Sequence, residues 1–124
     1  MGGSARRVEG CAWRSRPVKR YDIYFARLDP VQGSEMGKTR PVVIVSDDLR
    51  NQLLQTVVAC PLTSQLHPQW RSRLRVRCAR RAAEIAVDQI RVLSRARLTR
   101  KIAQLSTAEA EALRRLISEM YAQG

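Results

Sequence analysis

The sequence predicts a small α+β domain, in which a strongly curled antiparallel sheet or barrel is followed by a C-terminal helix. Short apolar runs separated by turn residues predict the sheet. The spacing between these runs is too short for βαβ units, which excludes a parallel sheet. The last part of the chain has helical periodicity. With 124 residues, the chain is long enough for one domain with its own core.

The first three apolar runs, residues 22–28, 41–45 and 56–62, are apolar at almost every position. This pattern is typical of strands that are covered on both faces. The polar loop between the first two runs is longer than a hairpin needs, and loops of this length are commonly functional. Residues 47–51 predict a short helical turn, for which Ser46 or Asp47 is the candidate N-cap.

The following part of the chain is rich in arginine. Residues 64–72 predict a surface loop, and residues 73–78 alternate so strictly that Arg73, Arg75 and Arg77 are expected on one face of a strand. The remaining expectations are a turn at 79–83, a strand at 84–92 with a polar break at Asp88-Gln89, and a short strand at 101–105. The three arginines form a candidate phosphate track, but they equally suit the protection of an edge strand.

Residues 106–121 predict a helix that packs on the sheet. Ser106 and Glu109 have the spacing of a capping box. Glu111 and Arg115 form an i, i+4 pair on the polar side. The apolar stripe consists of Leu113, Leu116, Ile117 and Met120.

The composition indicates a polyanionic partner. The chain has 23 basic and 11 acidic residues, a formal net charge of +12, and eleven of the basic residues lie between Arg71 and Lys101. Nucleic acid is the expected partner, because basic side chains release the counterions of phosphates. No apolar run approaches the ~20 residues of a membrane helix. The N-terminus lacks the apolar stretch of a signal peptide, so we expect a cytoplasmic protein without a membrane partner.

Residues 1–19 are basic and aperiodic, and we expect a disordered arm that precedes a domain of residues 20–124. The three cysteines, Cys11, Cys60 and Cys78, are odd in number and lack metal-ligand spacing. The single histidine, His67, is expected to be an ordinary surface residue. No metal or cofactor is expected.

Four segments carry a family resemblance. They are 28–30 (LDP) with 33–35 (GSE), 37–43 (GKTRPVV), 56–64 (TVVACPLTS) and 88–92 (DQIRV). In this order, over roughly residues 18–121, they resemble the MazF/PemK toxin endoribonucleases of type II toxin–antitoxin systems. The resemblance implies an SH3-like, CcdB/PemK-like barrel, a homodimer and an acidic MazE-like antitoxin. It also implies an enzyme that cuts single-stranded RNA.

Two residues are candidates for catalysis. RNA supplies its own nucleophile, the 2′-hydroxyl. The Arg40 guanidinium can stabilise negative charge on the phosphate, and the Thr63 hydroxyl can donate to a phosphate oxygen. From the residues alone, Arg40 equally suits an ion pair with Glu35 or Asp29, and Thr63 a turn cap. The resemblance assigns both to catalysis and leaves the general base and acid unassigned.

The expected function is that of a sequence-specific, metal-independent endoribonuclease, which leaves a 2′,3′-cyclic phosphate and a 5′-hydroxyl. Two alternatives are a CcdB-like toxin that binds a topoisomerase, and a regulator that binds nucleic acid without cutting it. The resemblance and the basic charge together give the expected RNA-binding residues, which are Ser34, Glu35, Lys38, Arg73, Arg75, Arg77, Asp88 and Gln89.

Overall fold

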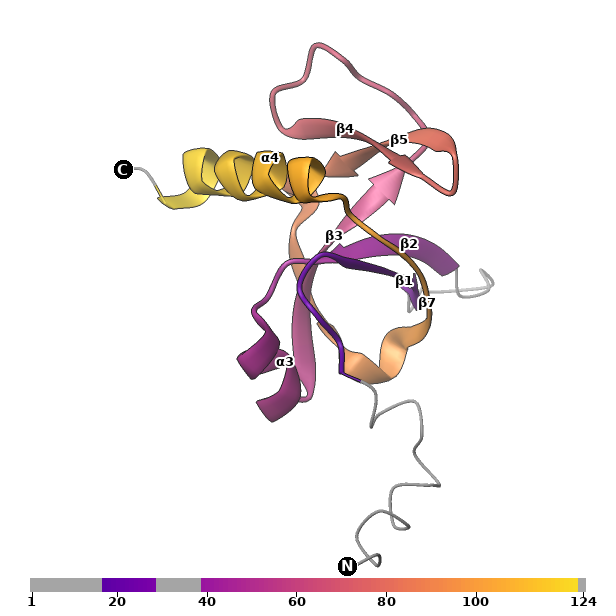
Figure 1. Ribbon diagram of the computed structural model, residues 1–124, viewed down its shortest axis with the longest axis vertical. Coiled ribbons are helices and arrows are strands. Elements are labelled where there is room, and N and C mark those ends of the chain that lie inside the picture. Colours follow the sequence, from indigo (N-terminus) through magenta and orange to yellow (C-terminus); the bar gives the residue numbers. More distant parts are fainter. Residues whose placement is uncertain (1–16, 29–38, 123–124) are drawn as a thin grey trace, which may run out of the picture.

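One antiparallel sheet curls into a half-open barrel, as the sequence predicts (Figure 1). The computed structural model describes residues 17–28 and 39–122. The strand order is β4-β5-β3-β2-β1-β7, and β6 pairs with β3 beside this path. The strands are β1 (Asp22–Arg27), β2 (Thr39–Ile44), β3 (Thr56–Thr63), β4 (Arg73–Cys78), β5 (Arg81–Ala86), β6 (Arg91–Ser94) and β7 (Leu98–Gln104).

Strand β3 causes the curl, because it pairs with two different strands along one edge. Its first half pairs with β6, from Thr56 to Ala59, and its end pairs with β5 at Leu62 and Thr63. The expected single strand at 84–92 is therefore wrong. The polar break at Asp88-Gln89 forms a 3-10 turn, η2 (Val87–Gln89), which separates β5 from β6.

Both faces of the central strands are buried. Val43 belongs to one apolar cluster together with Cys60 and Leu62, whereas its neighbours Val42 and Ile44 belong to the other. This explains why the central runs are apolar at nearly every position. Val18 is also buried, at 5% exposure, so the packed part of the chain includes at least one residue of the segment expected to be an arm. Residues 1–16 lie outside the described residues, as does the loop at 29–38.

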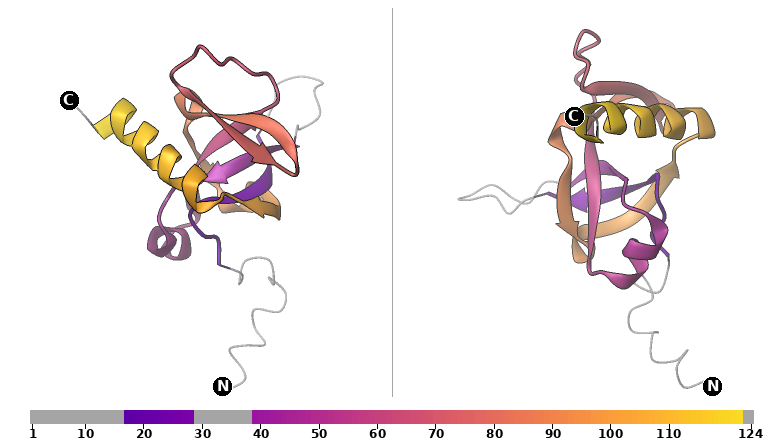
Figure 2. Two further views of the ribbon diagram at one scale, coloured as in Figure 1. Left: turned by 45° about the horizontal axis from the view of Figure 1, so that its top comes forward. Right: turned by 90° about the vertical axis from the view of Figure 1, so that its left-hand side faces the viewer.

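Two helices cover different ends of the sheet. Helix α4 (Thr107–Ile117) lies beside the β4–β5 hairpin, and α3 (Asp48–Leu53) follows β2 at the opposite end of β3 (Figure 2). The predicted capping box is present: Ser106 and Glu109 exchange hydrogen bonds of 3.0 and 3.1 Å. Leu113 is fully buried in the core, and the helix ends in a π-helical turn, η4 (Ser118–Ala122).

The β4–β5 hairpin turn is tighter than expected. Ala79 and Arg80 have φ angles of 53° and 70°, as the two central residues of a type I′ turn require, and β5 begins at Arg81. Among the residues that the structure describes, no helix is long and apolar enough to span a membrane.

Candidate active site

The pairing of β2 with β3 leads to Arg40 on one strand and Thr63 on the other. The paired residues run from Ile44 and Ala59 to Val42 and Pro61, and Arg40 and Thr63 each lie two residues beyond the last pair. The strand tips thus bring the two candidate catalytic residues together.

Arg40 and Thr63 line a shared cleft. Two cavities of about 390 Å³ each adjoin them, and both residues belong to the walls of both cavities. A larger cavity of about 480 Å³ contains neither residue and lies near β7. Within the part of the chain that the structure describes, no ion pair or side-chain hydrogen bond engages the Arg40 guanidinium, which is exposed and available to an anion.

The Thr63 hydroxyl is oriented by its own backbone. Its Oγ1 accepts a hydrogen bond of 3.1 Å from the Gln65 amide, two residues along the chain. This local turn uses a lone pair of the oxygen and leaves the hydroxyl proton free to donate. This geometry suits donation of the Thr63 hydroxyl to a phosphate oxygen. Thr63 can therefore cap the turn and bind a phosphate at the same time.

This part of the cleft is rich in arginine. Arg73 and Arg91 line it together with Arg40. Gln65 and Gln89 add uncharged hydrogen-bonding groups to the same wall. Such a combination of cations and amides suits a phosphodiester with an unstacked base.

One member of the expected row of guanidinium groups on β4 is covered. The Arg73 side chain is only 7% exposed, because its Nε contacts Asp88 at 3.2 Å and its Nη1 lies 3.7 Å from Glu84. Arg75 and Arg77 are exposed, as expected. Arg73 lines the cleft, and the two carboxylates hold its guanidinium.

The other expected RNA-binding residues do not all lie at the cleft. Gln89 lines the cleft, whereas Asp88 is occupied by Arg73. Ser34, Glu35 and Lys38 lie outside the described residues. The sequence interpretation missed Arg91, Gln65 and above all Glu84, whose charge interrupts the apolar run 82–87. That interruption was the available signal, since a buried carboxylate requires a partner.

Among the described residues, no group of three His, Cys, Asp or Glu side chains is close enough to hold a metal ion. Burial raises the pKa of the Cys60 thiol to about 12, which disfavours a nucleophilic thiolate. Cys60 and Cys78 are both free thiols.

Comparisons with known proteins concern the family and the fold of the chain. The family model described as PemK-like, MazF-like toxin of type II toxin–antitoxin system matches residues 19–121. The endoribonuclease EndoA of Bacillus subtilis is 37% identical to the chain, over 71% of this chain and 80% of EndoA.

Two solved structures show the same fold. A MazE–MazF structure from Deinococcus radiodurans has a TM-score of 0.75 at 18% identity and covers 89% of this chain and 100% of its own. A mycobacterial endoribonuclease in complex with its cognate antitoxin has a TM-score of 0.71 at 18% identity, covering 86% of this chain and 97% of its own.

Proposed function

Because the chain belongs to the PemK-like, MazF-like toxins of type II toxin–antitoxin systems, we propose that it is an endoribonuclease that cuts single-stranded RNA at a short sequence. Its curated relative EndoA is named as an endoribonuclease. One observation on this chain carries the proposal: the Arg40 guanidinium, which has no ion pair with any described residue, and the Thr63 hydroxyl line one arginine-rich cleft at neighbouring strand ends. These are the groups that RNA cleavage by its own 2′-hydroxyl requires.

In the proposed reaction the 2′-oxygen of RNA attacks the adjacent phosphorus. The bond from phosphorus to the 5′-oxygen of the next nucleotide breaks, so that a 2′,3′-cyclic phosphate and a 5′-hydroxyl remain. The Arg40 guanidinium donates hydrogen bonds to a non-bridging oxygen, on which negative charge increases as the phosphorane forms. The Thr63 hydroxyl donates to a phosphate oxygen and fixes the phosphorus in line with the attacking oxygen. No metal takes part in these steps.

The test is cleavage of a long RNA in EDTA, with the 5′ ends of the products mapped. We expect Arg40→Ala to lower kcat/KM by at least about 100-fold, because it removes the charge-stabilising donor. The matched control is Arg50→Ala, which makes the same change of net charge on α3, where the side chain is 72% exposed. It should cut at nearly the normal rate.

A second pair of variants isolates the hydroxyl at Thr63. Thr63→Val preserves the shape and should lower cleavage about 10- to 150-fold, as expected for one hydrogen bond to a charged group. Thr56→Val makes the same change at the exposed opposite end of β3 and should have little effect. Normal cutting by both site variants would remove these residues from the mechanism.

A substrate with 2′-deoxyribose only at the cut position tests the nucleophile. Continued cutting there would exclude attack by the 2′-hydroxyl. Intact RNA in all reactions, including the wild type, would instead favour a CcdB-like toxin or a regulator that does not cut.

The remaining parts of the proposal concern partners. A net charge of +12 suits an acidic antitoxin of the MazE kind, and the complexes solved for structural neighbours support such a partner. We also propose a homodimer, and a cytoplasmic location where messenger RNA is accessible. Ser34, Glu35, Lys38 and the exposed Arg75 and Arg77 are proposed to contact RNA around the cut.

A further inference from the structure

The loop between β3 and β4 holds an aromatic stack that the catalytic proposal does not use. The rings of His67 and Trp70 are parallel to within 7°, with their centroids 3.8 Å apart. The Arg73 guanidinium lies over the Trp70 ring at 4.6 Å. His67, Trp70 and Arg73 follow one another at intervals of three residues, and the amides of Trp70 and Arg73 donate to the carbonyls of His67 and Trp70. Successive turns of the loop thus build one column of stacked groups.

The inner end of this column is fixed to the cleft. Arg73 lines the cleft with Arg40 and Thr63, and both Glu84 and Asp88 hold its guanidinium. Glu84 pairs with Thr63 across β3 and β5 and with Arg75 across β5 and β4. Two strand spacings and two residues along β4 therefore separate Thr63 from Arg73, a Cα–Cα distance of about 12 Å. The column stands close to the proposed cut.

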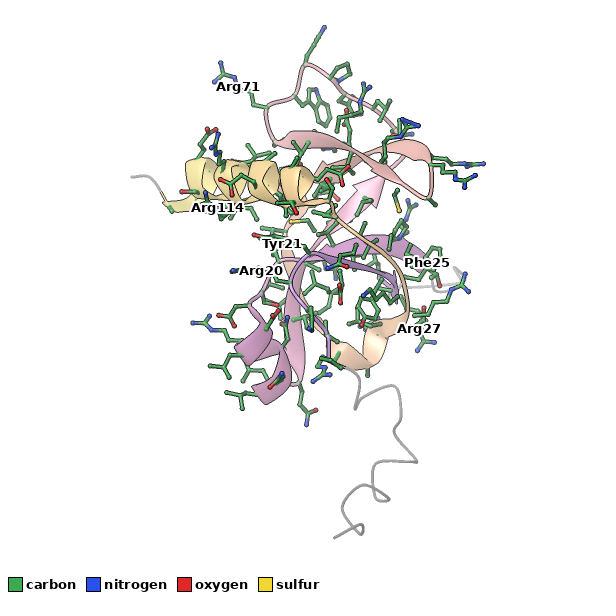
Figure 3. The ribbon with its side chains drawn as sticks, in the orientation of Figure 1. Arg20, Tyr21, Phe25, Arg27, Arg71 and Arg114 are labelled. Carbon is green, nitrogen blue, oxygen red and sulfur yellow. The ribbon has the colours of Figure 1, made fainter. Side chains whose placement is uncertain are left out.

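The outer end of the column is fixed through its backbone. The His67 amide donates to both carboxylate oxygens of Glu84, at 2.9 and 2.8 Å, and Glu84 itself is buried. The position of the imidazole is therefore set by the backbone and by Trp70 beneath it. Trp70 remains 47% exposed, and the neighbouring Arg71 projects from the loop away from the sheet (Figure 3).

We propose that the outer face of the His67 ring, supported by Trp70, is a stacking platform for one unstacked base of single-stranded RNA close to the scissile phosphate. Single-stranded bases splay out and stack on aromatic side chains, including histidine. A preformed platform requires less ordering of side chains when RNA binds. Exposed Arg71 is placed to contact the phosphate of the same nucleotide. This inference rests on the proposed RNA substrate but not on the cleavage chemistry.

The test is a binding experiment that does not depend on cutting. A short fluorescein-labelled RNA, spanning the mapped cut with 2′-deoxyribose at that position, or of mixed sequence if no cut is found, is bound to the wild-type protein and followed by fluorescence anisotropy. Abasic nucleotides then replace each position in turn. We expect one position at which the loss of the base weakens binding about 5- to 150-fold, the range for one stacked base.

The platform predicts coupling between that position and the stack. In the His67→Ala background the abasic substitution should have no further effect at this position, and Trp70→Ala should act in the same way. His67→Phe keeps an aromatic ring and should restore the sensitivity. All three variants retain the backbone amide of residue 67 and hence its hydrogen bond to Glu84.

The alternative outcomes are distinct. If His67→Ala leaves the abasic profile unchanged, or weakens binding equally at every position, the stack serves only the loop and the platform is refuted. If no variant cuts RNA but the coupling is found, the cleavage proposal fails and the platform stands.

Discussion

Replacing Glu84 with alanine should destabilise the protein by about 3 kcal/mol. Its carboxylate is 2% exposed, lies 3.7 Å from the Arg73 guanidinium and accepts the His67 amide. Removing one partner of a buried ion pair costs about 3–5 kcal/mol, because the other charge stays buried. We expect the lower end of this range, since Asp88 still contacts Arg73 at 3.2 Å. The unpaired His67 amide is part of the loss.

Urea unfolding followed by circular dichroism measures the effect. With a slope of about 1.5–2 kcal/mol per M, the midpoint should fall by about 1.5–2 M. Glu111→Ala is the matched control, because Glu111 also contacts two arginines, Arg114 and Arg115, but on the exposed side of α4. Its midpoint should hardly change, since exposed ion pairs contribute little and alanine favours helices.

The comparison of Glu84→Ala with Glu111→Ala tests whether burial of the carboxylate determines its contribution to stability. Both substitutions remove one negative charge from a protein with a net charge of +12. A shift for Glu84→Ala no larger than that for Glu111→Ala would refute the assignment of Glu84 as the buried support of the β3–β4 loop. Glu84→Gln keeps one oxygen for the His67 amide and should fall between the wild type and alanine.

Two further predictions follow from perturbed pKa values. Burial tends to raise the pKa of Glu109, but hydrogen bonds from the amides of Ser106 and Arg77 outweigh it and lower that pKa. The stabilisation by Glu109 is therefore fully present at a pH above the pKa of an unfolded-state glutamate, about 4.3, and is lost as the pH falls below it. The difference in urea midpoint between the wild type and Glu109→Gln should shrink accordingly in acid. Burial raises the pKa of the Cys60 thiol to about 12, so at pH 8 only about one Cys60 thiol in ten thousand is ionised. Iodoacetamide should therefore label Cys60 only in unfolded protein. Peptide mass spectrometry of the labelled protein measures this.

Much of the fold follows from local patterns. The spacing of Ser106 and Glu109 placed the start of α4, and the apolar stripe identified its buried face. The division of β3 between β5 and β6 could not be predicted in this way. Which strand pairs with which half of β3 depends on how the whole sheet curls, and a polar dipeptide within a strand does not reveal a change of partner.

The sequence identifies Arg40 and Thr63 as candidates but not the side chains that support their cleft. Arg40 and Thr63 were identified from the resemblance, and the structure places them at one cleft. Strict alternation puts Arg73 on one face of the strand with Arg75 and Arg77, and the structure adds that Glu84 and Asp88 hold its guanidinium. Alternation predicts the face of a strand but not whether that face is covered, and here the loop with Trp70 covers it. The spacing of His67, Trp70 and Arg73 was visible in the sequence, but its meaning required the turns of that loop.

The position of the site at two strand tips has a physical reason. Val42, Val43 and Ile44 are fully buried on alternating faces, and Ala59 and Cys60 face them across the pair. A shift of register by one residue would exchange the two faces of β2, so packing on both sides fixes the pairing. Beyond these buried residues Pro41 and Thr63 are partly buried, and Arg40 is exposed. The cleft that Arg40 and Thr63 line is therefore built at the end of the same strand pairing that stabilises the domain.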